Sequence, residues 1–286
     1  MIIRELLQSV RQQLGSNGDF LGAELLLAFV LGKNREFLLT HDDVEISDSD
    51  MNQFYELFDR MVKGEPVAYL LGHKEFFGLD FFVDSRVLIP RPETEHLVEW
   101  IVKYVKNRGD SANILDVGTG SGCIAIALAK NLPNIYVTGI DISSDAITVA
   151  KKNAEHNNVQ NAQFFQSDLL EKVQQPFDIV VANLPYIGEK RFSFVSKSAR
   201  DYEPHVALFG GDDGLQLYHK FFVQLAAMQW RPKLLLGEFG FLQTEELREL
   251  FLKVFPDNAI RFEQDYANID RMFVVDFSGV ASDALS

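Results

Sequence analysis

The chain has 286 residues, of which 41 are acidic (Asp and Glu) and 27 are basic (Lys and Arg), so its formal charge is −14 with histidine neutral. Hydrophobic residues make up 47% and charged residues 24%, which is typical of a globular protein and excludes a disordered one. Because Cys123 is the single cysteine, no intrachain disulfide can form, and nothing indicates secretion. The acidic balance argues against direct nucleic-acid binding, since such proteins usually present a basic face.

No segment predicts a membrane span or a signal peptide. The longest apolar stretch, residues 20–31, contains Glu24 and is shorter than the roughly 20 residues that a spanning helix needs. The N-terminus becomes charged at Arg4 and Glu5, too early for a signal peptide. We therefore expect a cytoplasmic protein with no membrane partner, and we expect a monomer.

The apolar pattern of residues 1–74 predicts helices and no strands. Apolar side chains recur at helical spacing in three groups: Leu6, Leu7, Val10 and Leu14; Leu25, Leu26, Phe29 and Val30; and Phe54, Leu57, Phe58, Met61 and Val62. Gly64, Glu65 and Pro66 end the third group. These patterns predict a small helical bundle as the first domain.

Residues 75–90 favour strands instead. Segments 76–83 and 87–89 are rich in aromatic and β-branched side chains, and Pro90 follows them. Pro92 suits the first turn of a helix over 93–106. We expect a β-hairpin linker over 75–90, followed by a second domain over 91–286.

From residue 113 onwards, strands and helices alternate. The expected strands are 113–117, 135–140, 163–166, 177–182, 233–237, 259–262 and 272–277, and the expected helices are 123–131, 144–157, 215–228 and 244–254. This alternation predicts an α/β fold with a mainly parallel seven-stranded sheet covered by helices on both faces. The two consecutive strands at the end predict an antiparallel edge.

A glycine-rich turn links the first strand of this domain to its first helix. It consists of Gly118, Thr119, Gly120, Ser121 and Gly122. Glycines permit a tight turn and close approach of a ligand to the backbone, although a turn without a ligand is the alternative. A nicotinamide-binding turn has two residues before its third glycine. In this chain a single residue, Ser121, separates the second glycine from the third. This spacing resembles the S-adenosylmethionine loop of class I methyltransferases.

Acidic residues follow the next two strands. Asp141 can accept hydrogen bonds from both hydroxyls of a ribose, its alternative role being a helix N-cap. Asp168 and Leu169 follow the third strand, at the place where the methyltransferase fold contacts adenine. Three features at three successive strand ends predict S-adenosyl-L-methionine as the cofactor and S-adenosyl-L-homocysteine as the product, with Asn183 as a further cofactor contact.

The reaction site is predicted in the segment after strand 177–182, which consists of Asn183, Leu184, Pro185 and Tyr186. The nitrogen of a primary amide or of an aryl amine is a poor nucleophile, because its lone pair is delocalised. Acceptors for both of its N–H groups would stabilise the positive charge that develops on it. The Asn183 side-chain oxygen can be one acceptor, and a carbonyl of Leu184 or Pro185 the other.

Each residue of this segment therefore has an expected role. Pro185 holds Leu184 in an extended conformation, and Tyr186 could lie against a planar substrate. We expect Asn183, Pro185 and Tyr186 to be catalytic, and all four residues to bind substrate. The motif alone leaves open a side-chain amide, adenine N6 or a simple turn.

Four further motifs resemble those of the release factor glutamine methyltransferases, in the same order along the chain. They are residues 64–72 (GEPVAYLLG), 89–95 (IPRPETE), 202–215 (YEPHVALFGGDDGL) and 237–240 (GEFG). The resemblance implies a class I methyltransferase fold preceded by a helical substrate-recognition domain. It also implies N5 methylation of the glutamine in the Gly-Gly-Gln motif of peptide chain release factors, the expected protein partners.

The resemblance has one departure, because the family usually has proline where this chain has Leu184. The sequence Asn-Leu-Pro-Tyr is also similar to the motif of ribosomal RNA adenine dimethyltransferases. On the resemblance alone, Arg91 and Thr94 could line the rim of the pocket. The six histidines are scattered without metal-ligand spacing, so no metal site is expected.

Three other functions stay open at this point. The first is an adenine-N6 methyltransferase acting on nucleic acid, which the acidic charge opposes. The second is a glutamine methyltransferase for a ribosomal protein, against which motifs 64–72 and 89–95 argue. The third is a cofactor-binding partner protein without activity, and the intact Asn183 motif argues against it.

Overall fold

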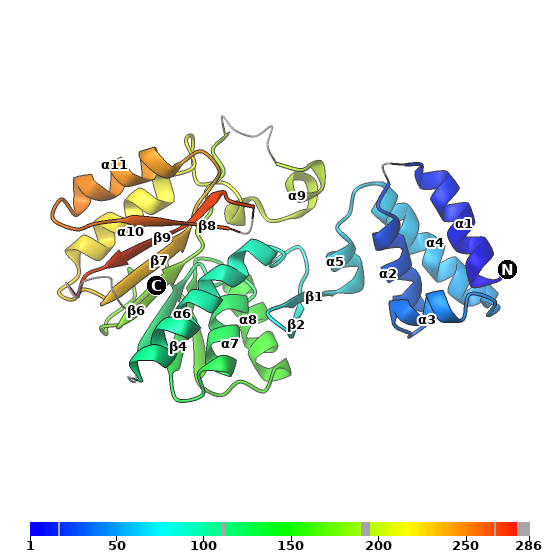
Figure 1. Cartoon of the computed structure of the whole chain (residues 1–286), viewed down its shortest axis with the longest axis horizontal. Helices are drawn as coiled ribbons and strands as arrows, with labels where there is room; N and C mark the ends of the chain where they lie inside the picture. Colours follow the sequence, from blue (N-terminus) through cyan, green and yellow to red (C-terminus); the bar gives the residue numbers. More distant parts are fainter. Residues whose placement is uncertain (17, 110–111, 190–194, 266, 279–286) are drawn as a thin grey trace. The chain divides into compact units, whose positions relative to one another are not determined.

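The structure is a computed structural model that describes residues 1–16, 18–109, 112–189, 195–265 and 267–278. The chain divides into two compact units (Figure 1). The first contains Met1–His73 and Ser196–Tyr202, and the second contains Lys74–Val195 and Glu203–Ser286. The sequence predicts residues 196–202 in the second domain instead.

The segment Ser196–Tyr202 groups with the first unit because its last residue packs there. Carbon Cε2 of Tyr202 lies 3.9 Å from the position that a Cβ at Gly64 would take. The Tyr202 ring thus lies beside Gly64, which the sequence pattern around 202 did not indicate.

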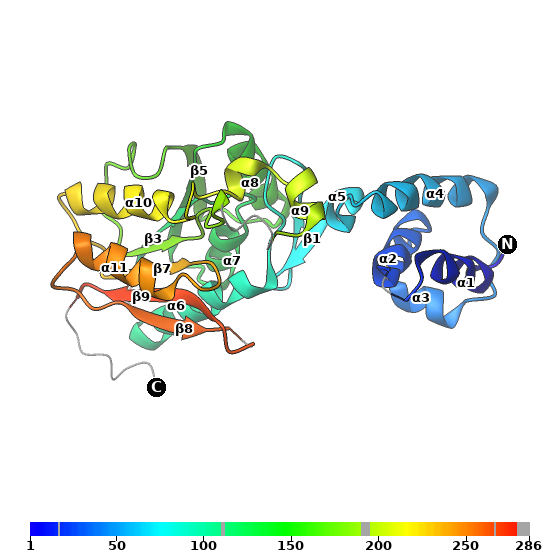
Figure 2. The same cartoon turned by 90° about the horizontal axis from the view of Figure 1, so that it is seen from above.

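Helices form the first unit, as predicted. In the described residues they are α1 (Ile3–Leu14), α2 (Phe20–Val30), α3 (Arg35–Thr40), α4 (Asp48–Val62), α5 (Val67–Leu71) and α9 (Lys197–Tyr202). The side chains of Asp19, Asn34 and Ser47 cap three of these helices by accepting a backbone N–H of the first turn. Helices α1 to α4 lie side by side around one apolar core (Figure 2).

The hairpin in the predicted linker 75–90 starts earlier than the sequence suggested. Strands β1 (His73–Phe76) and β2 (Leu79–Phe82) flank a two-residue turn. Phe77 and Gly78 form this turn with φ angles of 53° and 72°. Positive φ at both residues gives the turn type whose twist matches that of a two-stranded ribbon.

The strand predicted over 87–89 was wrong. Residues 84–87 form a turn, in which the N–H of Val87 donates to the carbonyl of Asp84 at 3.1 Å. Val87 and Ile89 are buried without belonging to a strand. Their apolar, β-branched side chains therefore reflect burial and not extended pairing.

The second unit contains the seven-stranded sheet that the sequence predicted. Its strands are β3 (Asn113–Val117), β4 (Tyr136–Asp141), β5 (Ala162–Gln166), β6 (Ile179–Ala182), β7 (Leu234–Glu238), β8 (Arg261–Gln264) and β9 (Asp270–Asp276). They lie in the order β5-β4-β3-β6-β7-β9-β8. The first five of this order are parallel, and β9 and β8 form the expected antiparallel edge (Figure 2).

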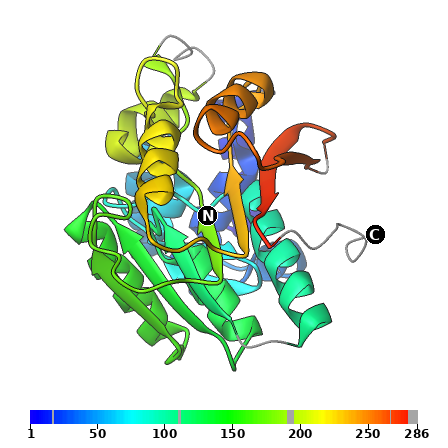
Figure 3. The same ribbon diagram turned by 90° about the vertical axis from the view of Figure 1, so that its left-hand side faces the viewer.

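Helices cover both faces of this sheet (Figure 3). On one face lie α6 (Glu95–Arg108), α7 (Cys123–Asn131) and α8 (Ser144–His156), and on the other lie α10 (Gln216–Ala227) and α11 (Thr244–Val254). The second unit also contains two 3₁₀ turns, η1 (Pro92–Thr94) and η3 (His205–Ala207). Among the helices of the described residues, none has the length and apolar character needed to cross a membrane.

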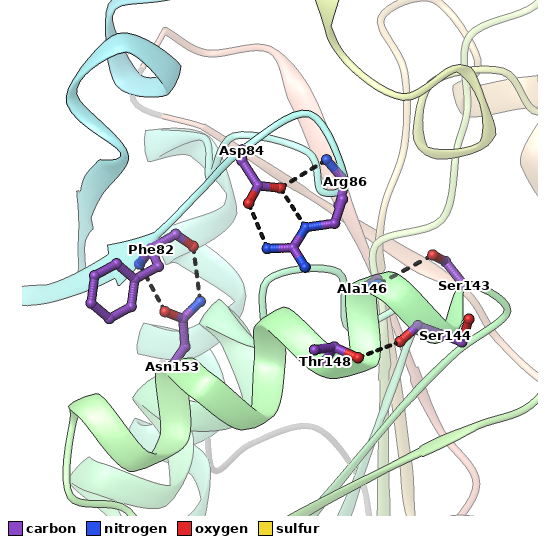
Figure 4. A network of polar contacts seen from close by, with 8 residues as sticks. All are labelled: Phe82, Asp84, Arg86, Ser143, Ser144, Ala146, Thr148 and Asn153. Atoms are coloured by element: carbon purple, nitrogen blue, oxygen red, sulfur yellow. Dashed lines mark hydrogen bonds and ion pairs between the residues drawn. The ribbon is translucent and has the colours of Figure 1, made fainter.

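A buried asparagine on α8 ties the hairpin to the rest of the second unit (Figure 4). The Oδ1 atom of Asn153 accepts the Phe82 N–H at 2.7 Å, and its Nδ2 atom donates to the Phe82 carbonyl at 3.0 Å. Nδ2 also donates to the carbonyl of Ser121 at 2.8 Å. One side chain thus satisfies three backbone groups on two segments distant in sequence.

Asn153→Ala is expected to lower the free energy of unfolding by about 3 kcal/mol, because it leaves buried backbone groups of Phe82 and Ser121 without partners. The control is Thr148→Ala on the same helix, whose exposed hydroxyl makes one bond to the Ser144 carbonyl. This control should change stability by less than about 0.5 kcal/mol. Chemical denaturation of the three proteins measures both effects, and equal losses in the two variants would contradict the role of Asn153.

Candidate active site

A cavity of about 810 Å³ opens at the carboxyl-terminal ends of the parallel strands. It lies where the strand order reverses, since β3 has β4 on one side and β6 on the other. Ligands of open α/β sheets bind at such points. The lining residues are 86–88, 117, 118, 120, 140–143, 146, 167–169, 183–185, 206, 207 and 217. All of them belong to the second unit.

The register of the sheet brings the predicted site residues to this edge. Val117 at the end of β3 pairs with Ile140 of β4 and with Ala182 of β6. Ala182 pairs in turn with Gly237 of β7. The residues that come next in each strand therefore stand in one row: Gly118, Asp141, Asn183 and Glu238.

Two glycines of the loop are required by close packing. Gly118 has φ +75°, and a Cβ there would lie 3.2 Å from Cδ2 of Leu184 and 3.3 Å from the carbonyl oxygen of Asn183. Gly122 has φ +82°, and its Cβ would lie 3.1 Å from Cβ of Ala150. Glycine thus lets the loop approach the Asn183 segment on one side and α8 on the other.

Three of the five predicted loop residues do not line the cavity: Thr119, Ser121 and Gly122. Thr119 is buried, and its hydroxyl donates to Oδ2 of Asp116 at 2.6 Å. The carbonyl of Ser121 is held by Asn153. These residues brace the loop from behind, while Gly118 and Gly120 face the cavity.

Asp141 faces the cavity with both carboxylate oxygens partly engaged. Oδ2 accepts the Gly120 N–H and Oδ1 accepts the Ser143 N–H, each at 2.9 Å. Burial raises the pKa of Asp141, and these backbone N–H groups oppose the rise. The Ile142 N–H is a third backbone partner, and because a carboxylate can accept about four hydrogen bonds, it keeps the capacity to bind a ligand. A pair of adjacent hydroxyls fits that arrangement.

Asp168 and Leu169 also line the cavity, in the loop after β5. The Oδ2 atom of Asp168 accepts a hydrogen bond from Nζ of Lys220 at 2.5 Å. This partner raises the pKa of Lys220. Leu169 has a φ of 50°, an unusual conformation for a branched side chain, and it is buried. Lys220 lies on α10, and no sequence motif indicated its role.

Asn183 is held by a buried carboxylate that the sequence analysis also missed. Its Nδ2 atom donates to Oε2 of Glu238 at 3.0 Å and to Oγ1 of Thr94 at 3.2 Å. Thr94 donates its own hydroxyl to Oε2 of Glu238 at 2.6 Å. Asn183, Leu184 and Pro185 line the cavity. The Asn183 carboxamide is thus oriented from its nitrogen end.

Tyr186 points its hydroxyl at the same carboxylate, donating to Oε1 of Glu238 at 2.9 Å. Burial and the nearby Glu238 raise the pKa of Tyr186 well above its usual value, so the phenol keeps its proton. Burial also raises the pKa of Glu238, while hydrogen bonds from Thr94 and Tyr186 and the charge of Arg271 lower it. Tyr186 does not line the cavity itself.

Two buried side chains fix the ends of β6 and β7 behind this group. The hydroxyl of Tyr218 donates its one hydrogen to the carbonyl oxygen of Glu238 and lies 3.3 Å from that of Ala182. The Nε2 atom of Gln243 donates to the carbonyl of Tyr186 at 2.9 Å. The backbone around the reaction segment is therefore held independently of any ligand.

Arg91 does not line the cavity, although the resemblance suggested its rim. Its Nη2 atom donates to Oε1 of Glu203 at 2.5 Å, and Oε2 of Glu203 accepts the Ile89 N–H at 3.1 Å. The cavity wall instead contains Arg86, which makes two side-chain hydrogen bonds to Asp84 (Figure 4). Nothing in the sequence around Arg86 indicated this position.

Glu238 belongs to the motif 237–240, but the sequence predicts no role for it. It follows the predicted strand 233–237 directly, as Asn183 follows its own strand. Among the described residues, no group of three or more His, Cys, Asp or Glu side chains is arranged to hold a metal ion.

Comparison with known families matches two parts of the chain. A model described as the PrmC N-terminal domain matches residues 5–72, and a model described as a methyltransferase domain matches residues 108–203. The release factor glutamine methyltransferase of Koribacter versatilis is 39% identical over 244 residues, covering 83% of this chain and 86% of the relative. The enzyme of the same name from Bacillus cereus is 36% identical, covering 95% of this chain and 98% of the relative.

A solved structure shares the fold at low sequence identity. It is the N-terminal domain of human METTL16 in complex with SAH, with a TM-score of 0.54 and 16% identity. The match covers 88% of this chain and 94% of that chain.

Asp116 lies inside β3, just before the glycine-rich loop, and its side chain is fully buried. Its Oδ2 atom is bound by Thr119, but Oδ1 has no hydrogen bond of normal geometry within the described residues. Burial raises the pKa of Asp116 to about 7, and the charge of Asp141 adds to the rise. The Thr119 hydroxyl and the Ala125 N–H oppose it.

Asp116→Asn is expected to remove a pH-dependent loss of stability. An unfolded aspartate titrates near pH 4, so the folded protein holds an extra proton between about pH 4 and 7 and its free energy of unfolding falls as the pH rises through this window. Asparagine keeps an acceptor for Thr119 but cannot ionise. Its stability relative to wild type should therefore increase over that window, which thermal unfolding in a buffer series measures. A constant Tm difference across the series would contradict the raised pKa.

Proposed function

The chain belongs to the release factor glutamine methyltransferase family, and we propose that it transfers a methyl group from S-adenosylmethionine to the side-chain amide nitrogen (N5) of the glutamine in the Gly-Gly-Gln motif of peptide chain release factors. The observation that carries this proposal is the orientation of Asn183. Its amide hydrogens are directed to Glu238 and Thr94, so its oxygen remains for a substrate N–H.

The groups that face the cavity fit S-adenosylmethionine. Asp141 would bind the ribose hydroxyls, Asp168 and Leu169 would flank the adenine, and Gly118 and Gly120 would let the backbone approach the ligand. When bound, the cofactor supplies a methyl group that its positive sulfur has already activated.

The reaction segment would then act on the glutamine amide. The Asn183 oxygen accepts one amide N–H, and a carbonyl of Leu184 or Pro185 accepts the other. Both acceptors stabilise the positive charge that develops on the nitrogen as it attacks. Tyr186 is not the base, because its hydroxyl hydrogen is already given to Glu238. No strong base is needed beforehand, since the proton can leave after transfer.

The helical first domain, 1–74, would serve recognition of the protein substrate. This role is supported by the match of residues 5–72 to a domain that accompanies the methyltransferase domain in this family. The monomeric state and the cytoplasmic location expected from the sequence stay predictions. The names of the relatives do not favour an adenine-N6 or a ribosomal-protein substrate.

Transfer of labelled methyl from S-adenosylmethionine to purified release factor tests the proposal. A factor with Gly-Gly-Ala in place of Gly-Gly-Gln and a sample of total RNA are run in parallel. Label in the native factor alone is expected. Label in RNA alone would overturn the proposed substrate and favour the adenine alternative.

Asn183→Ala is expected to lower kcat by about 100-fold or more, because it removes one acceptor at the charge that develops in the transition state. Cofactor affinity, measured by isothermal titration calorimetry, should change little. The matched control is Asn134→Ala, an exposed asparagine at the opposite end of the sheet. Unchanged binding together with an unchanged steady-state rate would show that Asn183 has no catalytic role.

A further inference from the structure

Glu238 collects three side-chain hydrogen bonds at the end of β7 while only 3% of its surface is exposed. Oε2 accepts from Asn183 and from Thr94, and Oε1 accepts from Tyr186. Because Gly237 pairs with Ala182, the sheet itself sets Glu238 beside Asn183. The carboxylate touches the predicted catalytic residues without lining the cavity.

The chemistry of these partners fixes which way the Asn183 carboxamide faces. Both oxygens of Glu238 act as acceptors, Oε1 for the Tyr186 hydroxyl and Oε2 for the Thr94 hydroxyl, so the atom of Asn183 that also faces Oε2 is the nitrogen. Thr94 has one hydroxyl hydrogen and gives it to Glu238, so towards Asn183 it can only accept. Both Nδ2 hydrogens are thereby used. No group among the described residues donates to the Asn183 oxygen.

We propose that Glu238 is a positioning residue that makes Asn183 present its oxygen to the substrate and thereby selects a side-chain amide over a carboxylate. The proposal rests on the proposed function, because it deepens the role of Asn183. A glutamine amide brings two N–H donors to the site. A glutamate carboxylate brings only acceptors, which the Asn183 oxygen and the neighbouring carbonyl repel.

Glu238→Gln reverses this constraint while keeping the size of the side chain. The new NH2 group donates, so the Asn183 carboxamide can turn and give its oxygen to residue 238. The NH2 end of Asn183 then faces the substrate. It attracts the carboxylate of a glutamate and no longer accepts from the amide nitrogen that has to react.

The measurement is the affinity of the full-length enzyme for intact release factor with Gly-Gly-Gln and for its Gly-Gly-Glu variant, by calorimetry with S-adenosylhomocysteine present. Wild type should bind the glutamine form more tightly. In Glu238→Gln this preference should fall by at least about tenfold, mostly because the glutamate form binds better. Cofactor affinity should hold, and kcat on the glutamine form should fall.

Two further variants separate orientation from general structural support. Glu238→Asp keeps an acceptor-only carboxylate, so it should retain the preference for glutamine even where kcat falls. Glu249→Gln, an exposed glutamate on α11, is the matched control and should leave affinities and rates unchanged. A Glu238→Gln protein that binds cofactor and keeps the wild-type preference would overturn the proposal, and so would a Glu238→Asp protein that loses it.

Where Glu238→Gln does not fold, Thr94→Val carries the test. It removes one of the two acceptors for the Asn183 amide hydrogens and should lower the preference by a smaller factor, so that an unchanged preference overturns the proposal. Failure of the proposed function looks different. In that case wild type itself transfers no methyl to release factor and does not distinguish its glutamine and glutamate forms.

Discussion

The parallel pairing of β4, β3, β6 and β7 is the constraint on which the site depends. Once Val117 pairs with Ile140 and with Ala182, and Ala182 with Gly237, the next residue of each strand is fixed at the same edge. A shift of one residue in β6 would turn every side chain of that strand to the opposite face. The buried apolar residues of both faces oppose such a shift, so the two cores of the second unit also hold the chemistry in register.

This edge gathers three carboxyl groups whose pKa values burial raises: Asp116, Asp141 and Glu238. They are stabilised mainly by hydroxyl, amide and backbone N–H donors, with the charge of Arg271 assisting only Glu238. In their ionised forms these carboxyl groups favour a cationic ligand over an anionic one. This preference suits a sulfonium cofactor and a reaction in which positive charge develops on nitrogen.

A site residue could be predicted from the sequence where a polar side chain comes at the end of an apolar strand. Asp141 and Asn183 follow apolar strands, and the structure places both at the cavity. Glu238 has the same sequence position, but its role depends on which strands are neighbours, and register cannot be read from one sequence. The same limit explains Lys220, which reaches Asp168 from a distant helix. The strand expected over 87–89 failed for another reason, because burial without pairing produces the same apolar pattern.

Leu184 illustrates how packing can replace a local conformational restraint. The proline that the family usually has there would restrict the backbone directly. Leu184 instead buries its side chain in the core shared by α10 and α11, with Cδ2 close to the site of a Gly118 Cβ. Tyr218 and Gln243 hold the carbonyls on either side. Because these contacts fix the segment through its neighbours, the atoms proposed to recognise the amide stay in place without a proline at position 184.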